Sequence, residues 1–311
     1  MGKIGKDAFG TIVKEQIGEY VRTDSMIEAE GENTSYSVVI APKGIDRMFL
    51  HCPGANDTFS SKDLDHEQIR GADLFHFGYP PLMKTMFRNN GEEFVKMFKT
   101  VSGLGTATSL DTASVDENAE SGKADWICIL KRVLPYVDFF VPSVEELAFM
   151  IDRPLYREWV GRANGRDLTE IIRLQEIRDL AETLISWGAG IVLLKCGTPG
   201  LYIAAGEGKD LKILSDKLGV DLSGWENVRH FEKSYRPEKV LSATGAGDTT
   251  IAAFLYAVMQ GYGWNECVQL ATAEGATCVE TYDAISGLRS LEELKGRIDA
   301  GWEKQDLACI Y

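Results

Sequence analysis

The order of apolar segments is the feature that most constrains the fold of this chain. Short apolar stretches typical of buried strands occur at residues 73–78, 107–111, 137–141 and 191–194. They alternate with longer stretches in which apolar residues recur at helical spacing, at residues 92–101, 126–134, 144–151 and 168–187. This alternation predicts an α/β fold, in which helices flank both faces of a doubly wound, mostly parallel sheet.

Two segments depart from the alternation. Residues 34–40 and 47–51 flank a glycine-containing loop at 42–46, which predicts an antiparallel hairpin. We expect this hairpin, at about residues 33–52, to form a small β lid beside the main sheet. Residues 206–239 are charged and irregular, which predicts surface excursions rather than a second domain. Residues 1–311 are therefore expected to form one domain.

The composition excludes several classes of partner. The formal net charge of −14 disfavours binding of nucleic acid or an anionic membrane by bulk attraction, so an anionic ligand would need a local positive site. The six cysteines show no metal-ligand spacing. No apolar run approaches the ~20 residues of a membrane span, and the first residues lack the apolar region of a signal peptide. We expect a cytoplasmic protein.

Small and acidic residues stand where the predicted strands end. Gly78, Asp111 and Gly197 each follow such a strand. In open α/β sheets ligands bind outside the carboxyl ends of the strands, so these residues are candidates for a binding site. Each of them could also be an ordinary turn residue.

The segment Ser242–Phe254 carries the strongest chemical signal. Apolar residues after Asp248 keep helical spacing, which places Gly245, Ala246 and Gly247 at a helix N-terminus. Unpaired N–H groups and the helix dipole favour an anion there, and small side chains let a phosphate come close. A carboxylate repels a bound phosphate, so Asp248 would not serve to bind it. It could instead take a proton from a hydroxyl that attacks the phosphate. The segment is therefore consistent with phosphoryl transfer to an alcohol.

A plainer interpretation of this segment stays open. It could be a glycine turn in which Asp248 only caps the helix. The chain lacks the GxxxxGK[ST] phosphate loop, which disfavours a P-loop nucleotidase. A lone GxG at residues 103–105 does not complete a dinucleotide fingerprint, so an NAD-dependent oxidoreductase is poorly supported.

Several motifs together resemble one family over nearly the whole chain. Thr244-Gly245-Ala246-Gly247-Asp248 resembles the C-terminal signature of the ribokinase-like (PfkB-type) carbohydrate kinases. Similar segments occur in the family's order at residues 2–10 (GKIGKDAFG), 54–56 (GAN), 142–146 (PSVEE) and 197–200 (GTPG). The resemblance implies a ribokinase-like fold, with ATP as the phosphate donor and Mg²⁺ as the metal.

The resemblance also implies roles for single residues. Asp248 would be the general base, the N–H groups of Gly245, Ala246 and Gly247 would form the anion hole, and Glu146 would help to hold Mg²⁺. For Glu146 the alternative is a solvated helix acid, and for the 197–200 segment it is a strand-to-strand turn. The nucleotide would be bordered by Thr244, Lys195, Gly197, Thr198 and Gly200, and the substrate by Tyr36, Asn56, Gly78 and Asp111.

The chain departs from the family pattern in four places. Ser242 and Ala243 stand where many members have Asp-Thr, which puts a monovalent-cation site in doubt. Ser143 replaces a usual Asn, and Lys195 replaces a common Thr. The family's N-terminal strand and GGxxxN segment have no counterpart before residue 2, so we expect an N-terminally incomplete kinase domain with part of the sugar site absent.

Three functions follow as hypotheses. The first is an ATP-dependent sugar kinase, and the second is a nucleoside kinase of the same fold. The third is a non-catalytic protein that binds a sugar or nucleotide. Lid strands of this family often pair between subunits, so the resemblance also implies a possible homodimer through the lid.

Overall fold

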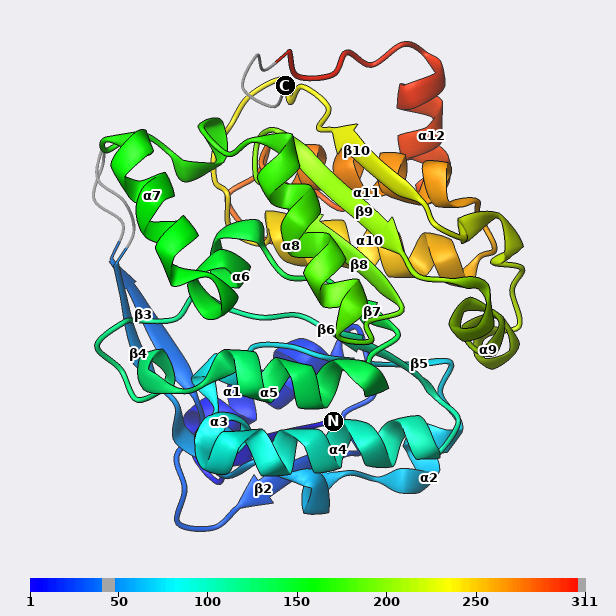
Figure 1. The fold of residues 1–311 in the computed structure, drawn as a ribbon. Coiled ribbons are helices and arrows are strands. Elements are labelled where there is room, and N and C mark those ends of the chain that lie inside the picture. The colour runs from blue at the N-terminus through cyan, green and yellow to red at the C-terminus, as the bar shows by residue number, and fades with distance from the viewer. Residues whose placement is uncertain (41–47, 307–311) are drawn as a thin grey trace.

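The computed structural model describes residues 1–40 and 48–306. Within them, the main sheet has six strands in the order β10-β9-β8-β7-β6-β5 (Figure 1). Neighbouring strands from β5 to β8 are parallel, and β9 and β10 are antiparallel to their neighbours. The strands are β5 (Leu74–Phe77), β6 (Ala107–Leu110), β7 (Phe139–Phe140), β8 (Ile191–Lys195), β9 (Gly200–Ala205) and β10 (Arg229–Lys233). The mostly parallel sheet is therefore confirmed.

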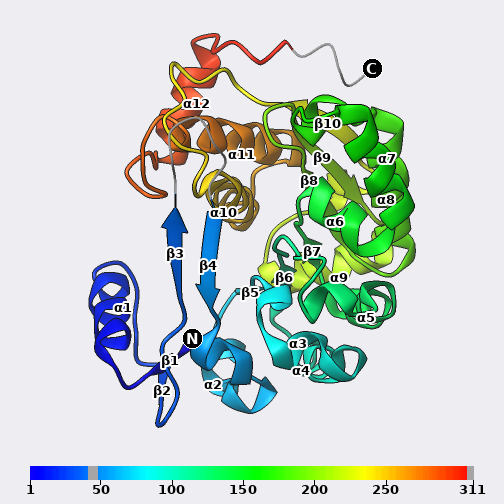
Figure 2. The ribbon, with the colours of Figure 1, turned by 90° about the vertical axis from the view of Figure 1, so that its left-hand side faces the viewer.

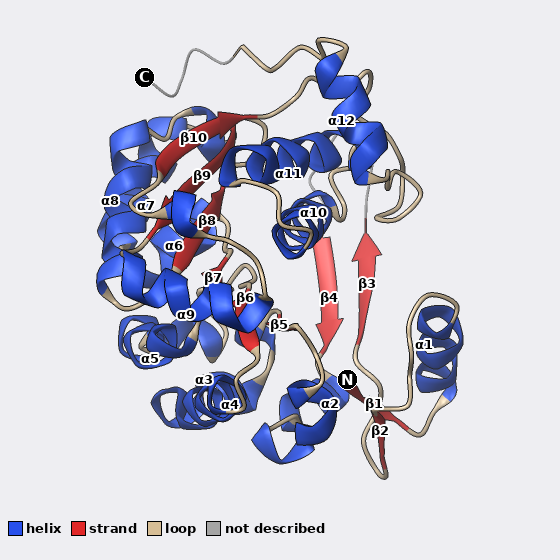
Figure 3. Ribbon diagram, turned by 90° about the vertical axis from the view of Figure 1, so that its right-hand side faces the viewer, coloured by secondary structure: helices blue, strands red, loops and turns tan. Residues whose placement is uncertain are grey.

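Helices cover both faces of this sheet (Figure 3). One hydrophobic core joins one face to α4, α5, α6 and α8, and a second core joins the other face to α10 and α11. The doubly wound arrangement is confirmed. The helices of the main body are α2 (His66–Arg70), α3 (Lys84–Phe87), α4 (Glu92–Gly103), α5 (Trp126–Val133), α6 (Val144–Ile151), α7 (Arg153–Ala163), α8 (Leu174–Ser186), α9 (Gly208–Leu218), α10 (Ala246–Met259), α11 (Trp264–Cys278) and α12 (Leu291–Asp299).

Three sequence-based expectations were wrong in detail. The segment 206–239 is not irregular, since it contains α9 and β10. Strand β10 lies at the sheet edge, where its half-buried positions tolerate charged residues. These charged residues interrupt the apolar pattern from which a strand would be predicted. The helix expected at 168–187 begins at Leu174, because Asp167 caps a separate short 3₁₀ turn at Leu168–Glu170. The strand expected at 137–141 is confined to Phe139–Phe140.

The predicted lid is present as a two-stranded antiparallel ribbon. Strand β3 (Tyr36–Ile40) pairs with β4 (Met48–Cys52), and the ribbon stands apart from the main sheet (Figure 2). The loop predicted at 42–46 lies outside the described residues. Most side chains of this ribbon are exposed, and they include Val38, Val39, Ile40, Met48, Phe49 and Leu50.

The first residues form a second small unit. Strand β1 (Gly2–Gly5) pairs in parallel with β2 (Met26–Ala29), and Asp7 caps α1 (Ala8–Gly18) between them. Within the described residues, β5 is paired with β6 on one side and unpaired on the other. The expectation of a further N-terminal strand stays a prediction. Among residues 1–40 and 48–306, no helix is long and apolar enough to cross a bilayer.

Candidate active site

Loops at the carboxyl ends of β5, β6 and β8 converge on the first turn of α10. Asp111 follows β6, and its N–H donates to the carbonyl of Phe77 at 3.0 Å. Lys195, the last residue of β8, donates to both oxygens of Asp111 at 2.8 and 2.9 Å. Asp111 is only 2% exposed, and this burial raises its pKa to about 6, although Lys195 opposes the shift. A buried ion pair thus ties two strands together at the expected edge of the sheet.

The N-terminus of α10 is shaped by two glycines. Gly245 caps the helix at φ 83°, and a Cβ at this position would overlap Ala284. Gly275 of α11 faces Thr250, and a Cβ there would overlap the Thr250 hydroxyl, so α10 and α11 pack closely. The sequence therefore needs glycine at 245 for the turn, and the prediction that α10 begins at the Gly-Ala-Gly segment is confirmed.

Lys195 also faces this helix N-terminus. A Cβ built on Gly247 would lie 3.7 Å from Cδ and 3.9 Å from Nζ of Lys195. The ammonium group, the helix dipole and the N–H groups of the first turn thus point to one small volume, although the N–H of Ala246 also donates to the carbonyl of Ala243 at 3.4 Å. In a chain of net charge −14, this volume is a local site suited to an anion.

Asp248 lies in the first turn of α10, and its side chain is exposed. The hydroxyl of Tyr79 donates to Asp248 Oδ1 at 2.6 Å. Sequence reasoning missed Tyr79, although it directly follows the glycine that ends a predicted strand. Its contact with a residue 169 positions away could not be read from local pattern.

Glu146 lies at the start of α6, beside the same group of loops. Thr112 Oγ1 donates to Glu146 Oε2 at 2.9 Å, and the N–H of Ser143 lies 3.4 Å from the same oxygen. No group of three or more His, Cys, Asp or Glu side chains in the described chain could hold a metal ion. A Mg²⁺ ion commonly uses one or two carboxylates plus waters and phosphate oxygens, so a single Glu146 fits that mode of binding.

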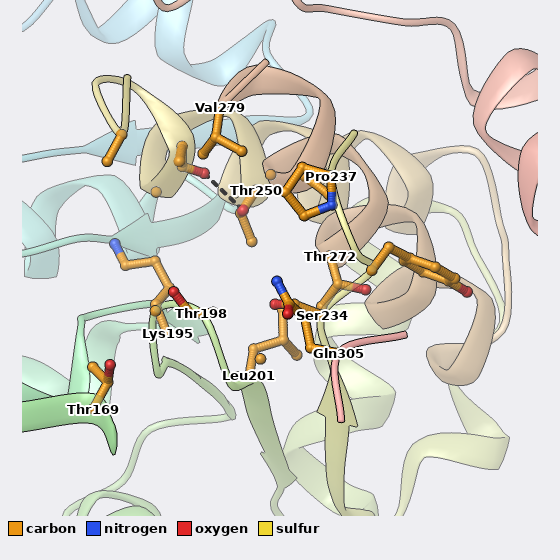
Figure 4. Close-up of a pocket in the computed structure, with 18 of the residues that line it drawn as sticks. Thr169, Lys195, Thr198, Leu201, Ser234, Pro237, Thr250, Thr272, Val279 and Gln305 are labelled. Carbon is orange, nitrogen blue, oxygen red and sulfur yellow. Dashed lines mark hydrogen bonds between the residues drawn. The ribbon is translucent and has the colours of Figure 1, made fainter. Parts of the chain in front are cut away.

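A pocket of about 390 Å³ opens beside Lys195 and α10. Figure 4 shows Lys195 and Thr198 on one side of it, and Ser234, Thr272 and Gln305 on another. Four more residues that were expected near the nucleotide or the anion hole also line it, namely Gly197, Gly200, Ala246 and Gly247. Glu145, which was not expected there, lines it as well. Thr244 does not line it. Its apolar wall is formed by Leu201, Tyr235, Pro237, Val240, Ala276 and Val279.

Sequence reasoning missed the C-terminal contribution to this pocket. The N–H of Gln305 donates to the carbonyl of Ser234 at 2.8 Å, and Trp302 stacks on Tyr235 at 4.9 Å. These contacts hold the last described residues against β10. Gln305 carried no motif, so no signal in the sequence could have found it.

Glu145 was also missed, although it precedes the expected metal ligand. Partial burial, Asp167 and Glu146 raise the pKa of Glu145 to about 7. Glu145 and Asp167 line the same pocket. The pocket lining therefore includes two acidic residues besides its apolar ones.

The expected substrate residues are only partly brought together. Asn56 and Gly78 line a second cavity of about 470 Å³ along β5, together with His76. Asp111 instead pairs with Lys195, and Tyr36 lies on the lid with its ring 5.1 Å from that of Phe9. Gly78 and Asp111 are nevertheless close, since β5 and β6 are neighbours in the sheet.

Comparisons with known proteins identify the family to which this chain belongs. Residues 1–291 match the family described as pfkB family carbohydrate kinase. An uncharacterized sugar kinase of Archaeoglobus fulgidus is 27% identical over 294 residues, which cover 93% of each chain. Arabidopsis thaliana ribokinase, solved with ribose and ATP, has a TM-score of 0.66 and 21% identity, and covers 95% of this chain and 80% of its own.

A third relative carries a metal as well. An E. coli protein described as ribokinase II, solved with ATP and Mg²⁺, has a TM-score of 0.65 and 19% identity over 96% of this chain and 83% of its own. The fold is thus that of ribokinases. The chain belongs to the PfkB family of carbohydrate kinases, which transfer phosphate to a sugar hydroxyl.

Proposed function

We propose that this chain transfers the γ-phosphate of ATP to a hydroxyl of a sugar, with Asp248 as the general base and the N–H groups of residues 245–247 as the anion hole. One observation carries the proposal. Asp248 lies in the first turn of α10, immediately after the anion site, and already accepts a hydroxyl hydrogen bond there. A proton acceptor and a phosphate site are thus adjacent.

The pocket beside Lys195 is suited to the donor nucleotide. Its apolar wall of Leu201, Val240 and Val279 fits a purine base, and Ser234 and Gln305 offer polar groups at its edge. Thr198, Gly197 and Gly200 lie along the turn between β8 and β9. The triphosphate would then extend from this pocket toward Lys195 and α10. ATP in the two solved relatives supports this choice of donor.

Transfer would proceed by a single displacement. The acceptor O–H gives its proton to Asp248, and its oxygen forms a bond to the γ-phosphorus. The bond from that phosphorus to the β–γ bridging oxygen breaks, and its electron pair leaves with ADP. The N–H groups of α10 and the Lys195 ammonium stabilise the charge on the transferring phosphoryl group. Mg²⁺, when bound near Glu146, would neutralise charge on the β- and γ-phosphate oxygens.

The acceptor would bind on the side of Asp248 away from the donor pocket, below the lid. Asn56 and Gly78 line the cavity there, and the β3–β4 ribbon would exclude water on closure. The exposed apolar side chains of this ribbon, such as Val38 and Leu50, also support a homodimer through the lid. Replacing Leu50 with Lys should then yield monomers in light scattering, and an unchanged mass would contradict this part of the proposal.

The test is ADP release across a panel of sugars and nucleosides, with ATP and Mg²⁺. Release with one or a few sugars supports the proposal and names the substrate. Release only with nucleosides would favour a nucleoside kinase. Tight ATP binding without release from any acceptor would favour a non-catalytic binder.

A further inference from the structure

We infer that Tyr79 is a positioning residue, whose hydroxyl fixes the carboxylate of Asp248 so that one oxygen stays available to the acceptor. The inference rests on the proposed function, in which Asp248 is the general base. It assigns a role to a residue that carries no recognised motif. Three observations support it: the backbone of Tyr79, the state of its hydroxyl, and the contacts of Asp248.

The backbone of Tyr79 adopts an unusual conformation. Its φ of 67° and ψ of 42° lie in the left-handed region, which bulky residues rarely occupy. The next two residues, Pro80 and Pro81, are buried and begin a short 3₁₀ turn, so they anchor the loop. Glycine would adopt this conformation at no steric cost. Strained residues of this kind persist where surrounding structure holds them, and they cluster at functional sites.

The hydroxyl of Tyr79 stays protonated at neutral pH and can donate a hydrogen bond. Burial, the hydrogen bond to Asp248, and the nearby charges of Asp111 and Glu146 all raise the pKa of Tyr79. The phenol therefore stays protonated and gives its single hydrogen to Asp248 Oδ1, at 2.6 Å. The residue as a whole is 39% exposed, so Tyr79 is partly buried and does not belong to the hydrophobic core. The left-handed conformation of the loop thus places the Tyr79 hydroxyl against Asp248, and the side chain does not pack into the core.

The contacts of Asp248 show what this bond leaves open. Among the described residues, Oδ2 of Asp248 has no hydrogen-bond partner. A carboxylate held at Oδ1 cannot rotate freely, so Oδ2 keeps one direction while the acceptor hydroxyl binds. A base that is oriented by a neighbouring group is pre-organised for proton transfer. Tyr79 would thus act on the reaction through Asp248 without touching phosphate.

The test combines Tyr79→Phe and Asp248→Asn, singly and together. The control is Tyr20→Phe, which removes the same atom from a side chain that is 72% exposed after α1. We expect Tyr79→Phe to lower kcat by roughly 10- to 100-fold with KM for ATP and the melting temperature unchanged. Tyr20→Phe should retain the wild-type kcat.

The double variant separates positioning from an independent role. If Tyr79 acts through Asp248, the double variant should have the same residual kcat as Asp248→Asn alone. A further loss of the full Tyr79→Phe factor in the double variant would overturn the inference. So would a Tyr79→Phe variant with wild-type kcat.

A second measurement keeps the inference separate from the proposed function. If the wild-type chain releases no ADP with any acceptor, the proposed function fails, and the positioning role is judged from crystal structures alone. The inference then predicts one conformation of the Asp248 side chain in the wild type and several in Tyr79→Phe. A single, unchanged conformation in both proteins would contradict it.

Discussion

Replacing Gly247 with alanine should separate the stability of α10 from its use as an anion site. Gly247 lies inside the helix with an ordinary backbone, and an added Cβ would meet only the Lys195 side chain at 3.7 to 3.9 Å. These are normal contact distances, so nothing in the free protein must move. Alanine should then stabilise the helix by about 0.5–1 kcal/mol. At about 2.1 cal/mol/K of unfolding entropy per residue, the melting temperature should rise by ~1 °C.

The same methyl group should impair phosphate binding. It would stand between the Lys195 ammonium and the helix N-terminus, where the phosphoryl oxygens are expected to lie. Displacing the transferring group by about 1 Å costs on the order of 10²-fold in rate, so kcat/KM for ATP should fall by that factor. Gly296 in α12 is a matched control, because a Cβ there meets nothing within 4 Å.

Two assays check this prediction, namely thermal melting and ADP release at varied ATP. Gly247→Ala and Gly296→Ala should melt at or slightly above the wild-type temperature, and only the first should lose activity. A stabilised Gly247→Ala variant with wild-type kcat/KM would refute the placement of the phosphate between Lys195 and α10.

Three further predictions concern the same framework. Gly245→Ala should destabilise the fold by about 2–4 kcal/mol, because it adds overlap with Ala284 to a left-handed backbone. The control Gly261→Ala, at φ 78° with nothing within 4 Å, should lose only about 1 kcal/mol. Equal losses of unfolding free energy in denaturant titrations would contradict this prediction. Lys195→Met breaks the partly buried ion pair with Asp111, and Lys217→Met breaks the one with Asp138, so both variants should melt at a lower temperature. Only Lys195→Met should also weaken ATP binding in calorimetry. An unchanged ATP affinity in Lys195→Met would argue against a role of Lys195 in phosphate binding. Burial raises the pKa of Glu274 to about 7, above its ordinary 4.5, so the stability from its protonated form is present below pH 4.5 and is lost as pH rises through 7. The unfolding free energy of Glu274→Gln should therefore equal that of the wild type at about pH 4 and exceed it by about 3 kcal/mol at about pH 8. A difference in unfolding free energy that does not change with pH would contradict the raised pKa of Glu274.

The sequence predicted most of the elements that build the sheet and missed the edge strand β10. Strands β6 and β8 are buried and β5 is partly buried, and the apolar run of each stands out between polar turns. Helix α6 was predicted with its observed bounds, Val144–Ile151. Strand β10 escaped notice because an edge strand buries less of each side chain and tolerates charge.

In the candidate site, the local motif could be predicted from the sequence and the long-range contacts could not. The Gly-Ala-Gly-Asp segment is local, so its place at the start of α10 could be predicted from helical spacing alone. The Lys195–Asp111 pair joins residues 84 positions apart, and the Tyr79–Asp248 bond joins residues 169 positions apart. Such contacts depend on strand order and loop conformation. A left-handed tyrosine, in particular, has no signature in the sequence.

The most direct test of the account is turnover of Asp248→Asn with the best acceptor, measured together with its affinity for ATP. Asparagine keeps the shape of the side chain but cannot take a proton. We predict that kcat falls by ~10² or more, as expected for loss of a general base, while ATP binds with wild-type affinity. An Asp248→Asn enzyme with wild-type turnover would contradict the central claim.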